Sequence, residues 1–177
     1  NGSLFTPTAT ATYTVTGSNS NNCSNTDQIT VTVNPVPTIS GSTTVCEGED
    51  ISLSIDINGG TWDSDDDGIA TVNSSGVVTG VGSGTTNITY TVNGCTDEYS
   101  VTVYAKPTIS GSLTATADGN NVTLSATGTA FGTNGWNSSS SAVATISSAG
   151  VVTPLTAGNT TITFTNSNGC TVQETFV

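Results

Sequence analysis

The stretch that decides the fold of this chain runs Trp62, Ile69-Ala70-Thr71-Val72, Gly76-Val77-Val78-Thr79, Ile88-Thr89-Tyr90-Thr91 and Asn93-Gly94-Cys95. The chain contains it twice. The second copy runs Trp136, Val143-Ala144-Thr145-Ile146, Gly150-Val151-Val152-Thr153, Ile162-Thr163-Phe164-Thr165 and Asn168-Gly169-Cys170, an offset of 74 or 75 residues. Pro-Thr-Ile-Ser-Gly-Ser precedes each copy, at 37–42 and at 107–112. Repetition at this period predicts an array of small domains.

Apolar residues alternate with Thr or Ser throughout both copies, and this alternation predicts strands. Representative runs are 51–55, 88–92, 99–103 and 122–126. A period of two places apolar side chains on one face of a sheet and hydroxyls on the other. Asn-Gly, Ser-Gly and Asp-Gly turns separate the runs, and no stretch has a helical period. We therefore predict an all-β chain of tandem two-sheet sandwiches.

Two short proline-containing linkers divide the chain into three parts. They are Asn34-Pro35-Val36-Pro37 and Ala105-Lys106-Pro107. We predict that residues 36–105 form one complete domain, that residues 106–177 form a second whose last strand is cut short, and that residues 1–35 hold the last strands of a further domain. Proline restricts its own backbone and that of the preceding residue, so we expect an extended, stiff array. We interpret the sequence as a segment of a longer array.

The charge of the chain excludes several classes of partner. The net charge is −12, and Lys106 is the only basic residue. Nucleic-acid binding needs Lys and Arg to neutralise phosphates, and anionic membranes attract basic segments. No apolar run approaches the roughly 20 residues of a membrane span. We expect no nucleic-acid partner and no membrane insertion in this segment.

Four aromatic residues recur in register and are predicted to form the structural core. Trp62 and Trp136 precede the same strand in their repeats, and Tyr90 and Phe164 share a position in a later strand. Recurring large apolar side chains usually mark burial. The alternative, a sugar stacked on an exposed tryptophan, requires the ring to face solvent.

The cysteines indicate a disulfide. Cys46 and Cys95 lie in one repeat, and the chain has no His and no Cys-x-x-Cys motif to suggest a metal cluster. We predict a Cys46–Cys95 disulfide, an oxidising compartment and a stabilisation of roughly 4 kcal/mol. The alternative is two free buried thiols. Cys23 and Cys170 both match Cys95; the partner of Cys23 is expected before residue 1, and Cys170 has no evident partner because the position that matches Cys46 is about Thr116.

An acidic turn is a candidate calcium site. Asp63, Asp65 and Asp67 alternate ahead of Gly68, as in the first half of an oxygen-ligand calcium loop. The full loop requires Glu at position 74, which is Ser74, and the matching segment of the last repeat has no acid. The alternative is a solvated acidic turn, and we expect no other cofactor.

Catalytic constellations are missing from the sequence. There is no His for acid–base chemistry, no paired thiolate and base, and no glycine-rich loop between a strand and a helix. Small serial sandwiches offer no cleft between two placed carboxylates. We predict that the chain is not an enzyme.

The repeated motifs resemble those of a known family. Trp62, Ile69-Ala70-Thr71-Val72, Gly76-Val77-Val78-Thr79-Gly80-Val81 and the run from Gly84 to Tyr90 are similar to the bacterial immunoglobulin-like (Ig-like) domain of group 2. The second copy departs at Pro154-Leu155. Thr44-Val45-Cys46-Glu47-Gly48-Glu49 with Asn93-Gly94-Cys95 resembles a variant in giant surface proteins of Bacteroidota. Residues 1–35 resemble the last strands of an Ig-like or PKD-like domain. The resemblance implies an extracellular array on the cell surface.

Three functions are compatible with that resemblance. The first is a structural stalk or filament segment of a large secreted adhesin, as in gliding bacteria that export such proteins by type IX secretion; its partners are neighbouring repeats, and its external surface ligand is unknown. The second is a glycan- or protein-binding module, which needs exposed aromatics; only Phe5 and Phe131 lack a core-phase position. The third is a self-assembling filament subunit that shares strands between chains.

Overall fold

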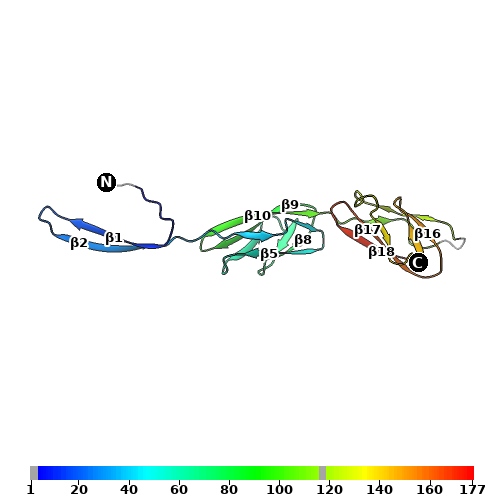
Figure 1. Cartoon of the computed structure of the whole chain (residues 1–177), viewed down its shortest axis with the longest axis horizontal. Coiled ribbons are helices and arrows are strands. Elements are labelled where there is room, and N and C mark those ends of the chain that lie inside the picture. The colour runs from blue at the N-terminus through cyan, green and yellow to red at the C-terminus, as the bar shows by residue number, and fades with distance from the viewer. Residues whose placement is uncertain (1–3, 116–118) are drawn as a thin grey trace.

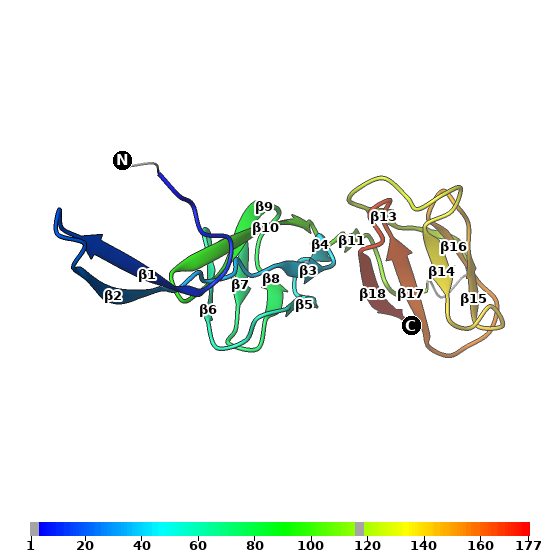
Figure 2. The same cartoon turned by 60° about the vertical axis from the view of Figure 1, so that its left-hand side comes forward.

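The computed structural model describes residues 4–115 and 119–177, and every regular element in these residues is a β-strand. Three units follow one another along the long axis of the molecule, and the amino-terminal hairpin and the last unit lie on opposite sides of the middle unit (Figure 1, Figure 2). The all-β prediction is confirmed. Within the described residues no helix is long and apolar enough to cross a membrane. The position near Thr116 lies outside them.

The amino-terminal unit is a two-stranded hairpin. Strands β1 (Ala11–Ser18) and β2 (Ser24–Val31) pair in antiparallel fashion, with Tyr13 opposite Ile29. The alternation places Tyr13, Val15 and Ile29 on one face, where Val15 and Ile29 are 63% and 59% exposed. The Phe5 ring contacts Tyr13 on this face, while Val15 and Ile29 stay exposed.

The middle unit is a sandwich of two four-stranded sheets. Its strands are β3 (Ile39–Gly41), β4 (Thr44–Cys46), β5 (Asp50–Ile55), β6 (Thr61–Ser64), β7 (Ala70–Val72), β8 (Val77–Gly80), β9 (Gly84–Val92) and β10 (Cys95–Tyr104). One sheet has the order β4-β10-β9-β6 and the other β3-β5-β8-β7. All neighbouring strands are antiparallel except β4, which runs parallel to β10.

The last unit repeats this plan with shorter strands. They are β11 (Ile109–Ser110), β12 (Val122–Thr123), β13 (Ser125–Ala126), β14 (Trp136–Ser138), β15 (Ala144–Ile146), β16 (Val151–Pro154), β17 (Thr160–Thr165) and β18 (Thr171–Phe176). β14-β17-β18 form one sheet and β12-β16-β15 form another, while β11 pairs with β13. Leu113 and Ala115 bond through their backbones to Val177, at the place that β4 occupies beside β10 in the middle unit.

Each unit has its own apolar core. Tyr90 is 3% exposed in the middle unit, and Trp136 and Phe164 are buried in the last. Trp62 is partly buried and packs against the first core. The Trp62–Tyr90 and Trp136–Phe164 ring pairs have the same centroid separation, 4.8 Å. The recurring aromatics therefore form equivalent core pairs.

A buried threonine differs between the two cores. The Oγ1 of Thr160 accepts a hydrogen bond from the Ser140 N–H at 3.0 Å and lies 2.9 Å from Ser138 Oγ. Thr86, at the matching position, is 6% exposed, and its hydroxyl has no hydrogen-bond partner among the described residues. A buried hydroxyl without a partner costs free energy, whereas a bonded one contributes to stability.

Replacing these two threonines by valine should therefore give opposite results. Thr160→Val is expected to lower the free energy of unfolding by about 1–3 kcal/mol, because it leaves the Ser140 N–H without its acceptor. Thr86→Val removes an unbonded hydroxyl and should leave stability unchanged or raise it. Urea denaturation of both variants measures the difference. Equal losses would contradict the assignment.

Candidate functional site: the junction between the two complete repeats

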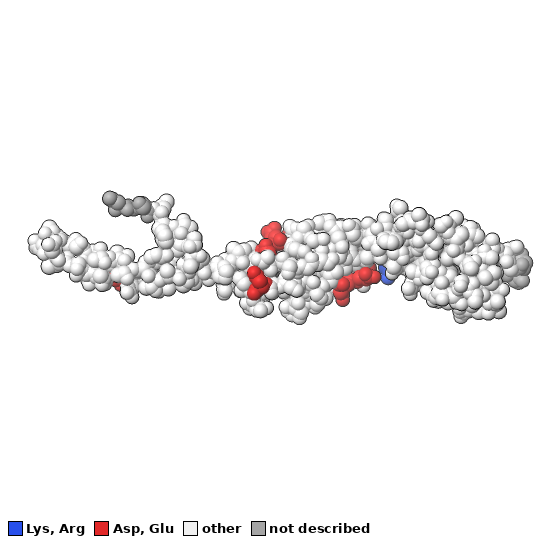
Figure 3. Space-filling model, in the orientation of Figure 1, with Lys and Arg blue, Asp and Glu red and all other residues white. Residues whose placement is uncertain are grey.

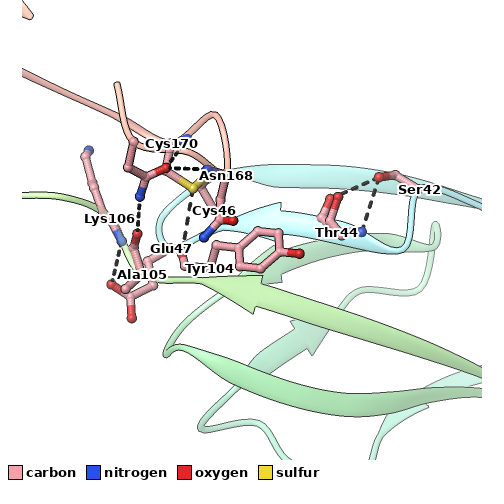
Figure 4. The surroundings of a disulfide bond; sticks show 10 residues. Ser42, Thr44, Cys46, Glu47, Tyr104, Ala105, Lys106, Asn168 and Cys170 are labelled. Atoms are coloured by element: carbon pink, nitrogen blue, oxygen red, sulfur yellow. Dashed lines mark hydrogen bonds between the residues drawn. A yellow bond between two sulfur atoms is a disulfide. The ribbon is translucent and has the colours of Figure 1, made fainter. Parts of the chain in front are cut away.

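A disulfide joins the middle unit to the last unit. Cys46 bonds to Cys170 across 124 positions of sequence, with their Cα atoms 5.7 Å apart (Figure 4). The two units are thus connected twice, once through the linker at Ala105-Lys106 and once through sulfur.

This bond corrects the predicted Cys46–Cys95 pair. Because β4 is parallel to β10, Cys46 lies opposite Tyr104 at the end of β10, whereas Cys95 begins the same strand. A ten-residue strand is about 30 Å long, so the two cysteines occupy opposite ends of the middle unit. A disulfide requires Cα atoms within about 7 Å.

The backbone of the middle unit fixes Cys46 at this end. The Glu47 N–H donates to the Tyr104 carbonyl at 2.9 Å, directly after the Cys46–Tyr104 register pair. The Glu47 carboxylate then accepts from the N–H groups of Ser83, at 2.8 Å, and of Lys106, at 3.2 Å. Glu47 therefore ties the β4 turn to the first residues of the linker.

A tight turn of the last unit presents Cys170. Asn166 Oδ1 accepts hydrogen bonds from the N–H groups of Asn168 and Cys170, each at 3.0 Å. Asn166 Nδ2 donates to the Ala105 carbonyl at 3.2 Å, and Cys170 Sγ lies 3.9 Å from the Tyr104 carbonyl oxygen. Both Asn166 and Cys170 are buried. The turn is built against the end of the middle unit.

Charge at the junction is mostly acidic. In the space-filling view the single basic residue, Lys106, lies beside acidic atoms where the two units meet (Figure 3). Its backbone bonds to Glu47, as described above. The side chains at the junction connect the two units through a disulfide and hydrogen bonds.

Two cysteines are free in the structure, Cys95 and the exposed Cys23. Cys23 ends a turn in which Asn19 Oδ1 accepts from the N–H groups of Asn21 and Cys23, each at 3.0 Å. These are the bonds that Asn166 makes in the Cys170 turn. Cys23 and Cys170 occupy matching positions in the sequence, and in the structure the turns that precede them have the same hydrogen bonds.

The tryptophans line equivalent pockets in the two repeats. Trp62, Tyr90 and Ser75 border a pocket of about 380 Å³, and Trp136 and Phe164 border one of about 300 Å³. Because the same scaffold positions form both, the pockets follow from the shared core. Phe131 is 58% exposed and Phe5 is 70% exposed, with the Phe5 ring 5.4 Å from that of Tyr13.

The acidic turn does not assemble a metal cluster. Asp63, Asp65 and Asp67 are all exposed, and the described residues contain no group of three or more His, Cys, Asp or Glu side chains that could hold a metal ion. The turn closes on itself, since the Asp66 carbonyl accepts from the N–H groups of Ile69 and Ala70. Ser140 makes the same two bonds in the last repeat, so the turn forms without acids.

Calcium binding at Asp63, Asp65 and Asp67 stays a prediction that titration tests. Isothermal titration of the chain with Ca²⁺ should release heat that disappears when the three are replaced by Asn. A chain that releases no heat and keeps its melting temperature would contradict a calcium site and leave a solvated acidic turn.

Comparison with known proteins identifies the repeats. The family model of the bacterial Ig-like domain (group 2) matches residues 25–103 and 106–176. The first match begins within β2, upstream of the boundary predicted at residue 36. No curated protein matches the chain.

Solved structures align with this chain at low sequence identity. A carboxy-terminal fragment of intimin, solved with the intimin-binding domain of its translocated receptor, aligns with a TM-score of 0.51 and 18% identity over 78% of this chain and 62% of the fragment. The S-layer protein SbsC, domains 4 and 5, gives 0.38 and 19% over 80% of this chain and 96% of that one. A SusE-like surface-located polysaccharide-binding protein from Bacteroides thetaiotaomicron gives 0.34 and 11% over 94% and 42%. By its two matched repeats, this chain belongs to the family of bacterial Ig-like domains of group 2.

Proposed function

We propose that this chain is a stalk segment of a large secreted bacterial cell-surface adhesin. The observation that carries the proposal is the Cys46–Cys170 disulfide, which bonds one repeat to the next. A stalk must hold its domains in line and transmit load between them. A second covalent connection beside the linker restricts bending between the two units, as a stalk requires.

The arrangement of the units agrees with a spacer. They follow one another end to end, and the pockets beside Trp62 and Trp136 arise from the shared scaffold (Figure 1). Disulfides form in oxidising compartments, which supports an extracellular location. We extend the proposal to the mobile adhesins of gliding Bacteroidota exported by type IX secretion; this part rests on the sequence resemblance.

A competition experiment separates a stalk from a binding module. Purified residues 1–177, added in excess to producing cells, should leave their attachment to a surface unchanged, because a stalk carries no receptor contact. Replacing residues 36–177 in the parent protein by an unrelated Ig-like spacer of equal length should also preserve attachment, whereas deleting them should weaken it. Blocking by the free chain would contradict the stalk and support the glycan- or protein-binding alternative.

A further inference from the structure

Cys95 lies at the same end of its unit as the bonded Cys170 does in the next unit, although Cys95 is only partly buried and begins β10 after a shorter turn. Each follows an Asn-Gly turn at the end of its unit. Cys95 Sγ lies 3.6 Å from the Asn34 carbonyl oxygen, and Cys170 Sγ lies 3.9 Å from that of Tyr104. Asn34 and Tyr104 both stand three residues before the proline of Pro-Thr-Ile. Each cysteine therefore contacts the same position of the preceding linker.

An asparagine side chain closes each of these junctions. At the second junction, Asn166 Nδ2 donates to the Ala105 carbonyl at 3.2 Å. At the first, the direction reverses, and Asn34 Nδ2 donates to the Asn93 carbonyl at 2.8 Å. Cys95 is partly buried. Both junctions therefore have a cysteine against the linker and an asparagine hydrogen bond across it, but only Cys170 has a sulfur partner.

The second junction shows where that partner stands. Cys46 lies on β4, which runs parallel to β10 and places Cys46 opposite Tyr104. The counterpart of β10 in the amino-terminal unit is β2. Beyond the end of β2, Val33 still pairs with the residue before β1, because its N–H and carbonyl both hydrogen-bond to the Thr10 hydroxyl. Among the described residues, β2 pairs with β1 alone, so its other edge is open. A strand parallel to β2 would place a residue opposite Asn34, beside Cys95.

The exposed apolar face of the hairpin indicates the kind of strand that is added. In the middle unit, the matching hairpin β9–β10 buries Ile88, Tyr90 and Val101 against the opposite sheet, while β4 covers its edge. Tyr13, Val15 and Ile29 form a similar face on β1–β2, and Val15 and Ile29 remain exposed. This face fits the remaining strands of an Ig-like sandwich.

We propose that Cys95 forms a disulfide with a cysteine on a strand that lies parallel to β2, with that cysteine opposite Asn34. The strand belongs to the Ig-like unit that β1–β2 complete, in the polypeptide leading into β1 of the parent protein. The two thiols lose two protons and two electrons as the S–S bond forms. A dithiol oxidoreductase in its disulfide form accepts them and becomes the dithiol. The result is a series of disulfides, each of which joins one repeat to the next as Cys46–Cys170 does. The proposal does not depend on a role in attachment.

A disulfide map of the parent protein tests this inference. The protein is taken from the producing cells with its free thiols blocked, digested without reduction and analysed by mass spectrometry. The Cys46–Cys170 peptide pair serves as internal reference. Cys95 should appear joined to a cysteine from sequence preceding residue 1 of the same molecule. Recovery of Cys95 as a blocked thiol, or its linkage to Cys23 or to a second copy, would overturn the proposal.

A recombinant chain provides a second test independent of the parent protein. Residues 36–106 are placed ahead of residues 37–177, so that an upstream Cys46 precedes the downstream Cys95 with the natural linker between them. The expected product has both junctions bonded and a single alkylatable thiol, the upstream Cys95. Changing only the upstream Cys46 to Ser should expose the downstream Cys95 as a further thiol. Equal alkylation of the two chains would refute the inference.

Discussion

Pulled from its two ends, the chain is expected to extend about 400 Å less with its disulfide intact than after reduction. The bond joins residues 124 positions apart whose Cα atoms are 5.7 Å from each other. Tension passes from β4 through the two sulfur atoms to β18 and bypasses the chain between them. At roughly 3.4 Å per residue, the bypassed segment accounts for about 420 Å of extended chain.

Single-molecule force spectroscopy measures this extension directly. Cys46→Ser should restore the full length without reductant, because it removes the bypass. Cys95→Ser is the matched control, since Cys95 follows the same Asn-Gly dipeptide as Cys170 and is free in this chain. It should extend like the unaltered chain. If reduction left the total extension unchanged, tension would not pass through this bond.

Cys46→Ser should also lower the free energy of unfolding of the last repeat by about 4 kcal/mol. Cys46 stands beside Tyr104, which leads into the linker, so the bond closes the chain from the linker to Cys170 into a loop. Closing a loop of this size restricts the unfolded chain by about that amount in the chain-entropy model. Cys46→Ser is preferred to Cys170→Ser, because Cys170 is fully buried and its substitution also disturbs packing.

Tryptophan fluorescence can follow the last repeat alone. In a Trp62→Phe background only Trp136 remains, and it lies in the core of that repeat. Urea denaturation should show a lower midpoint for Cys46→Ser and an unchanged midpoint for Cys95→Ser. A shift shared by both variants would attribute the loss to serine substitution itself.

Local pattern was sufficient to predict most of the fold. Alternation of apolar residues with Thr and Ser gives strands wherever one face is buried, as in β9, where Ile88, Tyr90 and Val92 are buried in turn. The internal repeat also showed which residues occupy equivalent positions, because alignment of the two copies places Tyr90 and Phe164 at the same point of their cores. The strand pattern and the repeat can both be recognised in a single sequence.

The disulfide could not be derived in the same way. Its partners are set by the parallel pairing of β4 with β10, a contact between segments far apart in sequence, and that pairing moves Cys46 a strand length from Cys95. One signal did point to the answer. The last repeat carries the counterpart of Cys95 and lacks that of Cys46, so a bond within each repeat leaves Cys170 unpaired. A bond from each repeat to the next provides Cys170 with a partner.

The double connection at the junction also fixes the rotation of one repeat relative to the next. Two bodies joined by a single linker can swivel about its bonds, whereas a second attachment through Cys46 and Cys170 removes that freedom. If consecutive junctions carry such bonds, each repeat keeps a constant azimuth relative to its neighbour. Twist applied at one end of the array would then reach the other end undiminished, and whatever the array carries would face a defined direction.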